Sequence, residues 1–469
     1  MPKILTSSVL SYIRFFAKKA LARHQPTIIG IAGSVGKTST RNALEAILRD
    51  HFPTKSIGNS ETGIPLGILG LKPEDYSKFD WIKMIARSPL NLDYLKGTKL
   101  LVAEMGIDEP DAPKNMEYLL TILQPNIAVS LNASATHSLQ FDKTVSDKSL
   151  SPEERLQAIV TNIAIEDTKI ITKSGAQIGV YNADDKYIPS VIARSETTKQ
   201  SQSDGIATAS LTPRNDNDCK LLSFGTKSTN DISFGTSKVS LRGSQFQLYI
   251  KNDEKLEEVT LIFPHHILPT EYREVFAAAI LVARTQGLTI KQIKESLEKN
   301  YQPPKGRSTL FEGINNSVII DSTYNASRVS VEAFLDLVDT LKKETNRPVV
   351  LLLADMRELG KEAQIEHMAV AEKLIGIVDY LYLVGPLTRE HILPVVQLKE
   401  SSFKEIRWFD SSTRAGEFLK DHLPDKSILL AKGSQNTLFL EEAVKMLLKD
   451  EKDAKNLCRQ DEFWMKIKK

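Results

Sequence analysis

The segment Pro26–Leu48, PTIIGIAGSVGKTSTRNALEAIL, constrains the fold of this chain more than any other. Its apolar run Ile28–Ala32 predicts a buried parallel strand, the residues Gly33–Gly36 predict a turn, and a helical pattern opens at Lys37. A turn of this kind directs consecutive backbone N–H groups and a helix N-terminus towards an anion. The segment therefore predicts a phosphate-binding loop at the start of an α/β domain.

Individual residues of this loop predict separate roles at a nucleoside triphosphate. Lys37 would bring positive charge to the terminal phosphates, and the Thr38 hydroxyl would be placed for Mg²⁺. The full pattern has a further glycine where Ile31 stands, but the short form still predicts a triphosphate site. The expected nucleotide-binding residues of the loop are Gly33, Ser34, Val35, Gly36, Lys37, Thr38 and Ser39.

Composition is that of a globular protein with two or three domains. The chain has 469 residues, of which 41% are hydrophobic and 26% are charged. Its 61 basic and 59 acidic residues are balanced, which argues against a nucleic-acid partner. The two cysteines, Cys219 and Cys458, match no metal-binding spacing, so we expect reduced thiols in a cytoplasmic protein.

The N-terminal residues 4–22 have apolar residues at helical spacing, interrupted by basic residues such as Lys18 and Lys19. These interruptions argue against a signal peptide, and no apolar run reaches the ~18 residues of a transmembrane helix. An amphipathic helix of this kind could make a peripheral membrane contact. The favoured interpretation is a helix docked on the ATP-binding domain.

Strand and helix patterns alternate along most of the chain and predict an α/β fold. Residues 27–301 predict a doubly wound central ATP-binding domain, in which Leu221–Phe263 alternates with period two and predicts an antiparallel side element. Residues 302–450 predict a Rossmann-like C-terminal domain. Residues 1–26 are assigned to the N-terminal helix, and the charged tail 451–469 predicts no obvious element. The polar stretch Ser190–Lys220 predicts a mobile surface insertion.

Polar residues follow the predicted strands of the central domain. Thr38, Glu104, His137 and Asn182 all come at strand ends, where ligands of such sheets bind. Thr38 and Glu104 are the hydroxyl and carboxylate ligands that Mg²⁺ accepts. Glu104 could instead organise a water molecule in an ordinary hydrolase, and His137 could be a hydrogen-bonding residue or a metal ligand.

Three strand-end segments of the second domain are also polar. They predict a second ligand-binding edge that faces the first, although each alone could be a helix cap or a turn. The segments are Asp321–Ala326, Asp355–Gly360 and Lys432–Gln435.

Taken in order, the motifs of both domains resemble the Mur ligase family, from about Thr27 to Leu448. The combined order is far more specific than any one motif. The segments that carry the resemblance are Gly33–Thr38, Asn59–Pro65, Glu104–Gly106, Asn132–His137, Asn182–Asp185, Gly306–Arg307, Asp321–Ala326, Asp355–Gly360 and Lys432–Ser434.

This resemblance implies an ATP-dependent amide (peptide) ligase of peptidoglycan precursor synthesis, with ATP and Mg²⁺ as cofactors. A substrate carboxylate would become an acyl phosphate, and an amine, with D-alanyl-D-alanine as the expected one, would then displace the phosphate. The resemblance implies that Lys37 neutralises the β and γ phosphates, that Thr38 and Glu104 hold one Mg²⁺, and that His137 helps to hold a second.

The resemblance assigns further residues to the nucleotide and to the substrates. Asn182, Arg307 and Asp321 are expected at the nucleotide, so that closure of the two domains would complete the site. The residues expected at the substrates are Asn59, Glu61, Tyr324, Asn325, Glu358 and Lys432.

Two departures from the family concern the acceptor and the second metal ion. The family has a uridine-nucleotide-binding domain before the loop, whereas 26 residues precede Thr27 here. A lipid-linked peptidoglycan precursor is therefore an alternative to a small-molecule acceptor. The family also has a carbamylated lysine after the histidine, and the spacing permits either Asp167 or Lys169 at that position.

Two further departures lie at the nucleotide and in the second domain. Arg273 and Glu274 stand where an adenine-contacting asparagine is expected. Arg328 replaces a proline, and Gln435 replaces an arginine. The lost adenine-contacting asparagine and the open position of the carbamate leave a nucleotide-binding scaffold without catalysis as an alternative, although retention of Lys37, Thr38, Glu104 and His137 favours the ligase.

Overall fold

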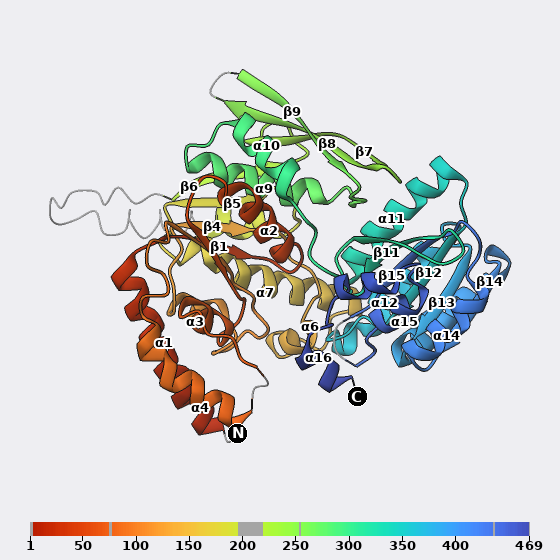
Figure 1. Ribbon diagram of the computed structural model, residues 1–469, viewed down its shortest axis with the longest axis horizontal. Helices are drawn as coiled ribbons and strands as arrows, with labels where there is room; N and C mark the ends of the chain where they lie inside the picture. The colour runs from red at the N-terminus through yellow and green to blue at the C-terminus, as the bar shows by residue number, and fades with distance from the viewer. Residues whose placement is uncertain (1–2, 75–76, 196–218, 253–254, 435–436, 469) are drawn as a thin grey trace.

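The chain folds into two α/β domains that lie side by side (Figure 1). The computed structural model describes residues 3–74, 77–195, 219–252, 255–434 and 437–468. Each domain is built on its own sheet, and each sheet has helices on both faces. The predicted α/β class, with a doubly wound first domain and a Rossmann-like second domain, is confirmed.

The first sheet has nine strands in the order β2-β3-β1-β4-β5-β6-β7-β8-β9. Strand β1 (Thr27–Ala32) is apolar and buried along almost its whole length, because a parallel strand is covered on both faces. Burial alternates along β8, as predicted for the antiparallel element. The other strands of the parallel part are β2 (Thr54–Ile57), β3 (Leu100–Glu104), β4 (Ile127–Ser130), β5 (Ile178–Asn182) and β6 (Lys220–Gly225), and the antiparallel strands are β7 (Ile232–Ser240), β8 (Gly243–Asn252) and β9 (Lys255–Pro264).

Helices cover both faces of this sheet and bury the apolar residues of its strands. One face packs against α2 (Lys37–Leu48), α9 (Tyr272–Thr285) and α10 (Ile290–Asn300). The opposite face packs against α3 (Gly63–Ile68), α5 (Met116–Leu120) and α7 (Pro152–Thr172). This double covering leaves the carboxyl ends of the strands as the open edge, at which the loop after β1 lies.

The N-terminal helix α1 (Lys3–His24) packs against α3 and α4 (Lys78–Arg87). Ile13, Ala17 and Ala20 are fully buried, because their three- and four-residue spacing places them on one face. The helix therefore packs on the first domain through one apolar face. Across the described part of the chain, the helices are too short or too polar to cross a membrane.

The second sheet has six strands in the order β10-β11-β15-β12-β13-β14. Only β10 (Thr309–Glu312) runs antiparallel to its neighbour, so the remaining strands direct their carboxyl ends to one edge. Those strands are β11 (Val318–Ser322), β12 (Val349–Ala354), β13 (Tyr380–Val384), β14 (Glu405–Phe409) and β15 (Ile428–Lys432). One face is covered by α11 (Arg328–Thr345), α12 (Ala363–Leu374) and α13 (Leu393–Gln397), and the other by α14 (Ser412–His422) and α15 (Glu441–Leu447).

The C-terminal residues differ from the sequence prediction, which assigned them no element. They form η6 (Glu451–Asn456) and α16 (Glu462–Ile467), and α16 begins at Asp461, whose side chain accepts a hydrogen bond from the Trp464 amide. The many charged residues of this segment suggest that it is exposed to solvent. It is instead held in place by the N-cap of the helix and by buried ion pairs of Arg459 and Lys468 with Glu441.

Residues 188–195 are helical, and most of the predicted insertion Ser190–Lys220 lies outside the described residues. Short helices connect the larger elements. They are η1 (Ser88–Asn91), α6 (Ser138–Phe141), η2 (Asp142–Thr144), η3 (Gly360–Glu362), η4 (Thr388–Ile392) and η5 (Glu400–Ser402).

Candidate active site

A cleft of about 460 Å³ lies between the two domains at the carboxyl ends of their strands. This volume is within the range of small-molecule binding sites. The cleft is lined by many of the residues that the sequence singled out, which are Ser34, Val35, Gly36, Lys37, Thr38, Ser39, Asn59, Glu104, His137, Asn182, Arg307, Tyr324, Asn325 and Lys432.

The loop between β1 and α2 has a backbone that only glycine adopts without strain at two positions. Gly33 has φ 131° and Gly36 has φ 94°. The Asn132 side chain braces the loop from the neighbouring strand end, because its Oδ1 accepts from the Val35 amide at 2.8 Å and its Nδ2 donates to the Val35 carbonyl at 3.1 Å. The loop is thus held in the shape of an anion-binding cradle.

Lys37 is half-buried at the first turn of α2, and its ammonium points back into the loop. Its Nζ donates to the carbonyl oxygens of Gly33 and Ser34, the latter at 3.4 Å. Burial lowers the pKa of Lys37, while the carboxylates of Asp167 and Glu104 act in the opposite direction. A phosphate bound by the amides of this loop would stabilise the partly desolvated Lys37 ammonium.

Glu104 is held by two residues of α2. The Thr38 hydroxyl donates to Glu104 Oε2 at 3.0 Å, and Arg41 Nη1 lies 2.8 Å from Glu104 Oε1. Arg41 was missed in the sequence, although it lies four residues after Lys37 and therefore on the same helix face. A hydroxyl beside a carboxylate fits Mg²⁺. Within the described residues no group of three or more His, Cys, Asp or Glu side chains could hold a metal, so the other ligands would have to be phosphates and water.

Asp167 and Lys169 lie on α7 but face different surroundings. Asp167 is buried beside Lys37, and its Oδ2 has no hydrogen-bond partner. Burial raises the pKa of Asp167 to about 7, and Lys37 opposes that rise. Lys169 instead pairs with Glu166 at 2.5 Å and with Glu117 at 3.7 Å. Of the two alternatives from the sequence, Asp167 is the one at the phosphate loop.

His137 connects the two domains beside the cleft. Its Nδ1 lies 2.6 Å from Glu358 Oε2, and this hydrogen bond lowers the pKa of Glu358. Nearby, Ser138 Oγ donates to the Leu359 carbonyl at 3.0 Å, and the Leu139 amide donates to the Glu358 carbonyl at 3.1 Å. Glu358 also lines a small cavity next to the cleft, together with Thr136, Asn325, Arg357 and Ser434.

The second domain supplies two cations to the cleft. The Arg307 guanidinium lies 4.7 Å from the centre of the Tyr324 ring, and the Tyr272 hydroxyl donates to the Arg307 carbonyl at 3.2 Å. Lys432 is buried, and its Nζ donates to the Asn325 carbonyl and, at 3.5 Å, to that of Ser322. Burial and the Arg307 charge lower the pKa of Lys432 to about 7.

Comparisons with known proteins agree with this two-domain site. Residues 306–435 match the family described as Mur ligase, glutamate ligase domain. The chain is similar to UDP-N-acetylmuramoyl-tripeptide–D-alanyl-D-alanine ligases, with 23% identity to that of Buchnera aphidicola over 96% of this chain and 81% of the relative. The corresponding ligase of Borreliella burgdorferi is 26% identical over 92% of this chain and 77% of the relative. The chain carries a Mur ligase C-terminal domain, and most of its length is homologous to MurF ligases.

Solved structures show the same architecture. MurF of Thermotoga maritima in complex with ADP superposes with a TM-score of 0.68 at 19% identity, covering 95% of this chain and 84% of that one. MurF of Acinetobacter baumannii superposes with a TM-score of 0.67 at 19% identity, covering 94% of this chain and 81% of that one. The predicted arrangement of a central and a C-terminal domain is therefore shared with this group.

Three residues that the Mur ligase resemblance placed at the ligands, Asp321, Glu61 and Glu358, do not line the cleft, and Glu358 lies in the small cavity beside it. Asp321 is fully buried behind it, where Oδ1 accepts from the amide and the hydroxyl of Thr323 at 3.0 and 2.6 Å. Glu61 is half-buried near Lys114 and Asp108, and its pKa is raised by burial. Asp321 thus shapes the loop after β11 from behind.

Glu274 lines the cleft where the family pattern led us to expect an asparagine. It is half-buried, and Asn182 Nδ2 donates to Glu274 Oε2 at 3.2 Å. Burial raises the pKa of Glu274 to about 8, and the neighbouring Glu271 acts in the same direction. A protonated carboxyl beside an amide presents both hydrogen-bond donors and acceptors to a ligand.

Glu274→Gln is expected to raise thermal stability at pH 8.5 and to leave it almost unchanged at pH 5. A carboxyl whose pKa is about 8 when folded and 4.5 when unfolded keeps its proton in the folded state, so folding stability falls as pH rises between these values. Glutamine is neutral throughout and removes that loss. Melting temperatures measured at both pH values check this, with the exposed Glu295→Gln as the control. Equal shifts at both pH values would contradict the raised pKa.

Proposed function

We propose that this protein is an ATP-dependent amide ligase that joins the carboxylate of a UDP-N-acetylmuramoyl-tripeptide to D-alanyl-D-alanine. The observation that carries the proposal is a single cleft with the phosphate loop and Lys37 on one wall and Arg307 and Lys432 of the second domain on the other. Cations on both sides of a transferring phosphoryl group stabilise its charge better than a one-sided site.

In the first step a carboxylate oxygen attacks the γ-phosphorus of ATP, and the bond to the β–γ bridging oxygen breaks. The products are an acyl phosphate and ADP. Backbone amides of the loop and Lys37 bind the β and γ phosphates, and Arg307 meets the developing charge from the second domain. Thr38 and Glu104 would hold a Mg²⁺ ion, whose chemistry is to neutralise phosphate charge.

In the second step the amine attacks the acyl carbon, and the tetrahedral intermediate expels inorganic phosphate while the nitrogen loses a proton. Glu358 supports this half of the site, because its lowered pKa keeps it ionised and able to bind an ammonium group. His137 orients that carboxylate across the domain boundary. Its role as a ligand of a second metal ion, with Asp167 as the adjoining carboxylate, belongs to the same proposal.

Asn59, Tyr324 and Asn325 are proposed to contact the substrates, because they line the cleft beside the proposed reaction centre. Asn182 and Glu274 are proposed to bind the base of the nucleotide. The protein would act in the cytoplasm, where ATP and these precursors are present.

Lys37→Ala is expected to reduce ADP release by roughly 100- to 1,000-fold, because it removes the cation that stabilises the transferring phosphate. ADP is measured over a matrix of candidate carboxylates and amines, with Mg²⁺ and ATP present. The exposed Lys291→Ala is the matched control, and it should retain full turnover. Failure of every carboxylate and amine pair to release ADP from the wild type would overturn the ligase in favour of a scaffold.

A lipid-linked precursor is a second candidate acceptor, favoured by the exposed face of α1. Tyr12 and Phe15 are 40% and 52% exposed, and Lys18 and Lys19 are exposed on the same helix. Aromatic and basic residues together favour an anionic membrane surface. This candidate predicts that the protein co-sediments with anionic phospholipid vesicles and that Phe15→Ser with Lys19→Ala releases it while ADP binding is kept. Absence of co-sedimentation at low salt would exclude it.

A further inference from the structure

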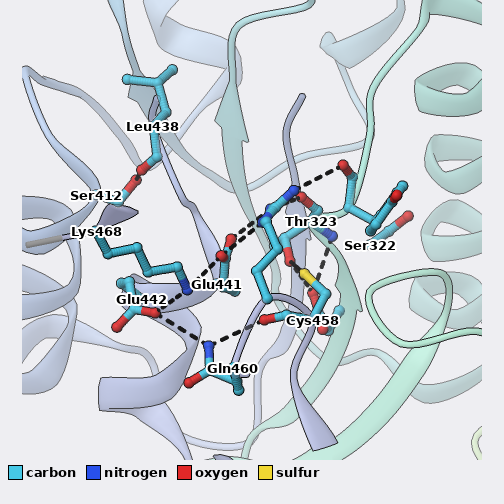
Figure 2. Close-up of polar contacts among 12 residues, drawn as sticks. Ser322, Thr323, Ser412, Leu438, Glu441, Glu442, Cys458, Gln460 and Lys468 are labelled. Atoms are coloured by element: carbon cyan, nitrogen blue, oxygen red, sulfur yellow. Dashed lines mark hydrogen bonds and ion pairs between the residues drawn. The ribbon is translucent and has the colours of Figure 1, made fainter. Parts of the chain in front are cut away.

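The last residues of the chain pack behind the loop that carries Tyr324 and Asn325. Cys458 is buried, and its sulfur lies 3.5 Å from the Thr323 hydroxyl (Figure 2). A Cβ atom at Gly306 would lie 2.9 Å from the same sulfur, so the segment before Arg307 is in close contact as well. Three segments distant in the sequence therefore meet at one point behind the cleft.

Arg459 connects these segments through one planar group. Its Nε and Nη2 lie 2.8 and 2.6 Å from the two carboxylate oxygens of Glu441 at the start of α15. Nη2 also donates to the Thr323 carbonyl at 2.8 Å, and Nη1 donates to the Tyr324 carbonyl at 3.2 Å. One guanidinium thus fixes the position of the loop after β11 relative to α15.

Arg459 lies outside the cleft, whereas the loop that it holds lies at the cleft. Tyr324 and Asn325 line it, and the Tyr324 ring is the surface on which Arg307 lies. The Tyr324 amide also donates to the Gly306 carbonyl at 3.1 Å. A displacement of the Tyr324 backbone would therefore move the Arg307 guanidinium, which lines the same cleft as the phosphate loop.

Lys468 belongs to the same cluster, but its described contacts are with Glu441, Glu442 and the Phe439 ring and not with that loop. Its Nζ lies 2.7 Å from Glu441 Oε1 and 2.5 Å from Glu442 Oε1 (Figure 2). Glu441 consequently keeps a cationic partner when Arg459 is replaced. Replacing Arg459 therefore removes the hydrogen bonds to the Thr323 and Tyr324 carbonyls without leaving the Glu441 carboxylate unpaired.

We propose that Arg459 is a positioning residue, which sets the Thr323–Tyr324 backbone and through it the Arg307 guanidinium for binding the nucleotide phosphates. The inference rests on the proposed function, in which the cleft binds ATP. Replacing a buried ion pair as a whole is often neutral for the free energy of unfolding. The role that we assign to the Arg459–Glu441 pair is therefore to hold the guanidinium in position and not to stabilise the fold. A guanidinium offers five N–H groups in a fixed plane, and a lysine ammonium cannot reproduce them.

Arg459→Lys, which keeps the charge, tests the proposal, and Lys468→Met serves as the control of the same cluster. We expect Arg459→Lys to weaken ADP binding by about tenfold, as for the loss of charge-assisted hydrogen bonds, and Lys468→Met to leave it within about twofold. The melting temperatures of both variants are also measured, which shows whether a change in ADP affinity comes from a loss of folding stability. ADP affinity is measured by titration calorimetry with Mg²⁺ present.

Hydrogen–deuterium exchange of the residues 320–327 without nucleotide gives an independent measurement of the loop. Exchange should rise in Arg459→Lys and stay unchanged in Lys468→Met. Equal changes in the two variants, in affinity or in exchange, would overturn the positioning role. A wild type that binds no ADP would contradict the proposed function instead, and the exchange experiment would still decide whether Arg459 holds the loop.

Discussion

The site depends on one electrostatic constraint, which is the partial burial of the Lys37 ammonium inside the loop between β1 and α2. Its hydrogen-bond acceptors are backbone carbonyls of that loop, and its pKa is lowered by desolvation. Gly33 and Gly36 with their positive φ angles, the Asn132 brace and the Thr38–Glu104 hydrogen bond are arranged around this group. Such a cation is incompletely compensated by protein groups, so an anionic phosphate would complete its surroundings.

The second domain completes the cleft because its own parallel strands end at the same place. Lys432 at the end of β15 holds the Asn325 backbone, and Arg307 rests on Tyr324. His137 and Glu358 join the domains across the boundary. These contacts join the two walls of the cleft, so the proposed site for a triphosphate and an acceptor needs both domains.

Much of this arrangement could be predicted from the sequence, because it depends on local patterns. Apolar runs ending in polar residues located the strands and placed Lys37, Thr38, Glu104 and His137 at one edge. The choice between Asp167 and Lys169 required the rotation of α7, which buries Asp167 with Ile163 and Ile170. The contact of Arg459 with Glu441 and Tyr324 was beyond prediction, because it joins residues separated by 18 and 135 positions and belongs to a tail that reads as solvated.

In the proposed reaction, this cleft transfers the γ-phosphoryl group of ATP to a carboxylate before any amine reacts. Positional isotope exchange tests it most directly, with ATP labelled by heavy oxygen at the β–γ bridge and UDP-N-acetylmuramoyl-tripeptide present without D-alanyl-D-alanine. Reversible acyl-phosphate formation predicts that the label moves from the bridge to the non-bridging β positions, because the β-phosphate of bound ADP rotates before ATP re-forms. If the label stays in the bridge although the enzyme releases ADP when both the carboxylate and the amine are present, formation of an acyl phosphate before the amine reacts is contradicted.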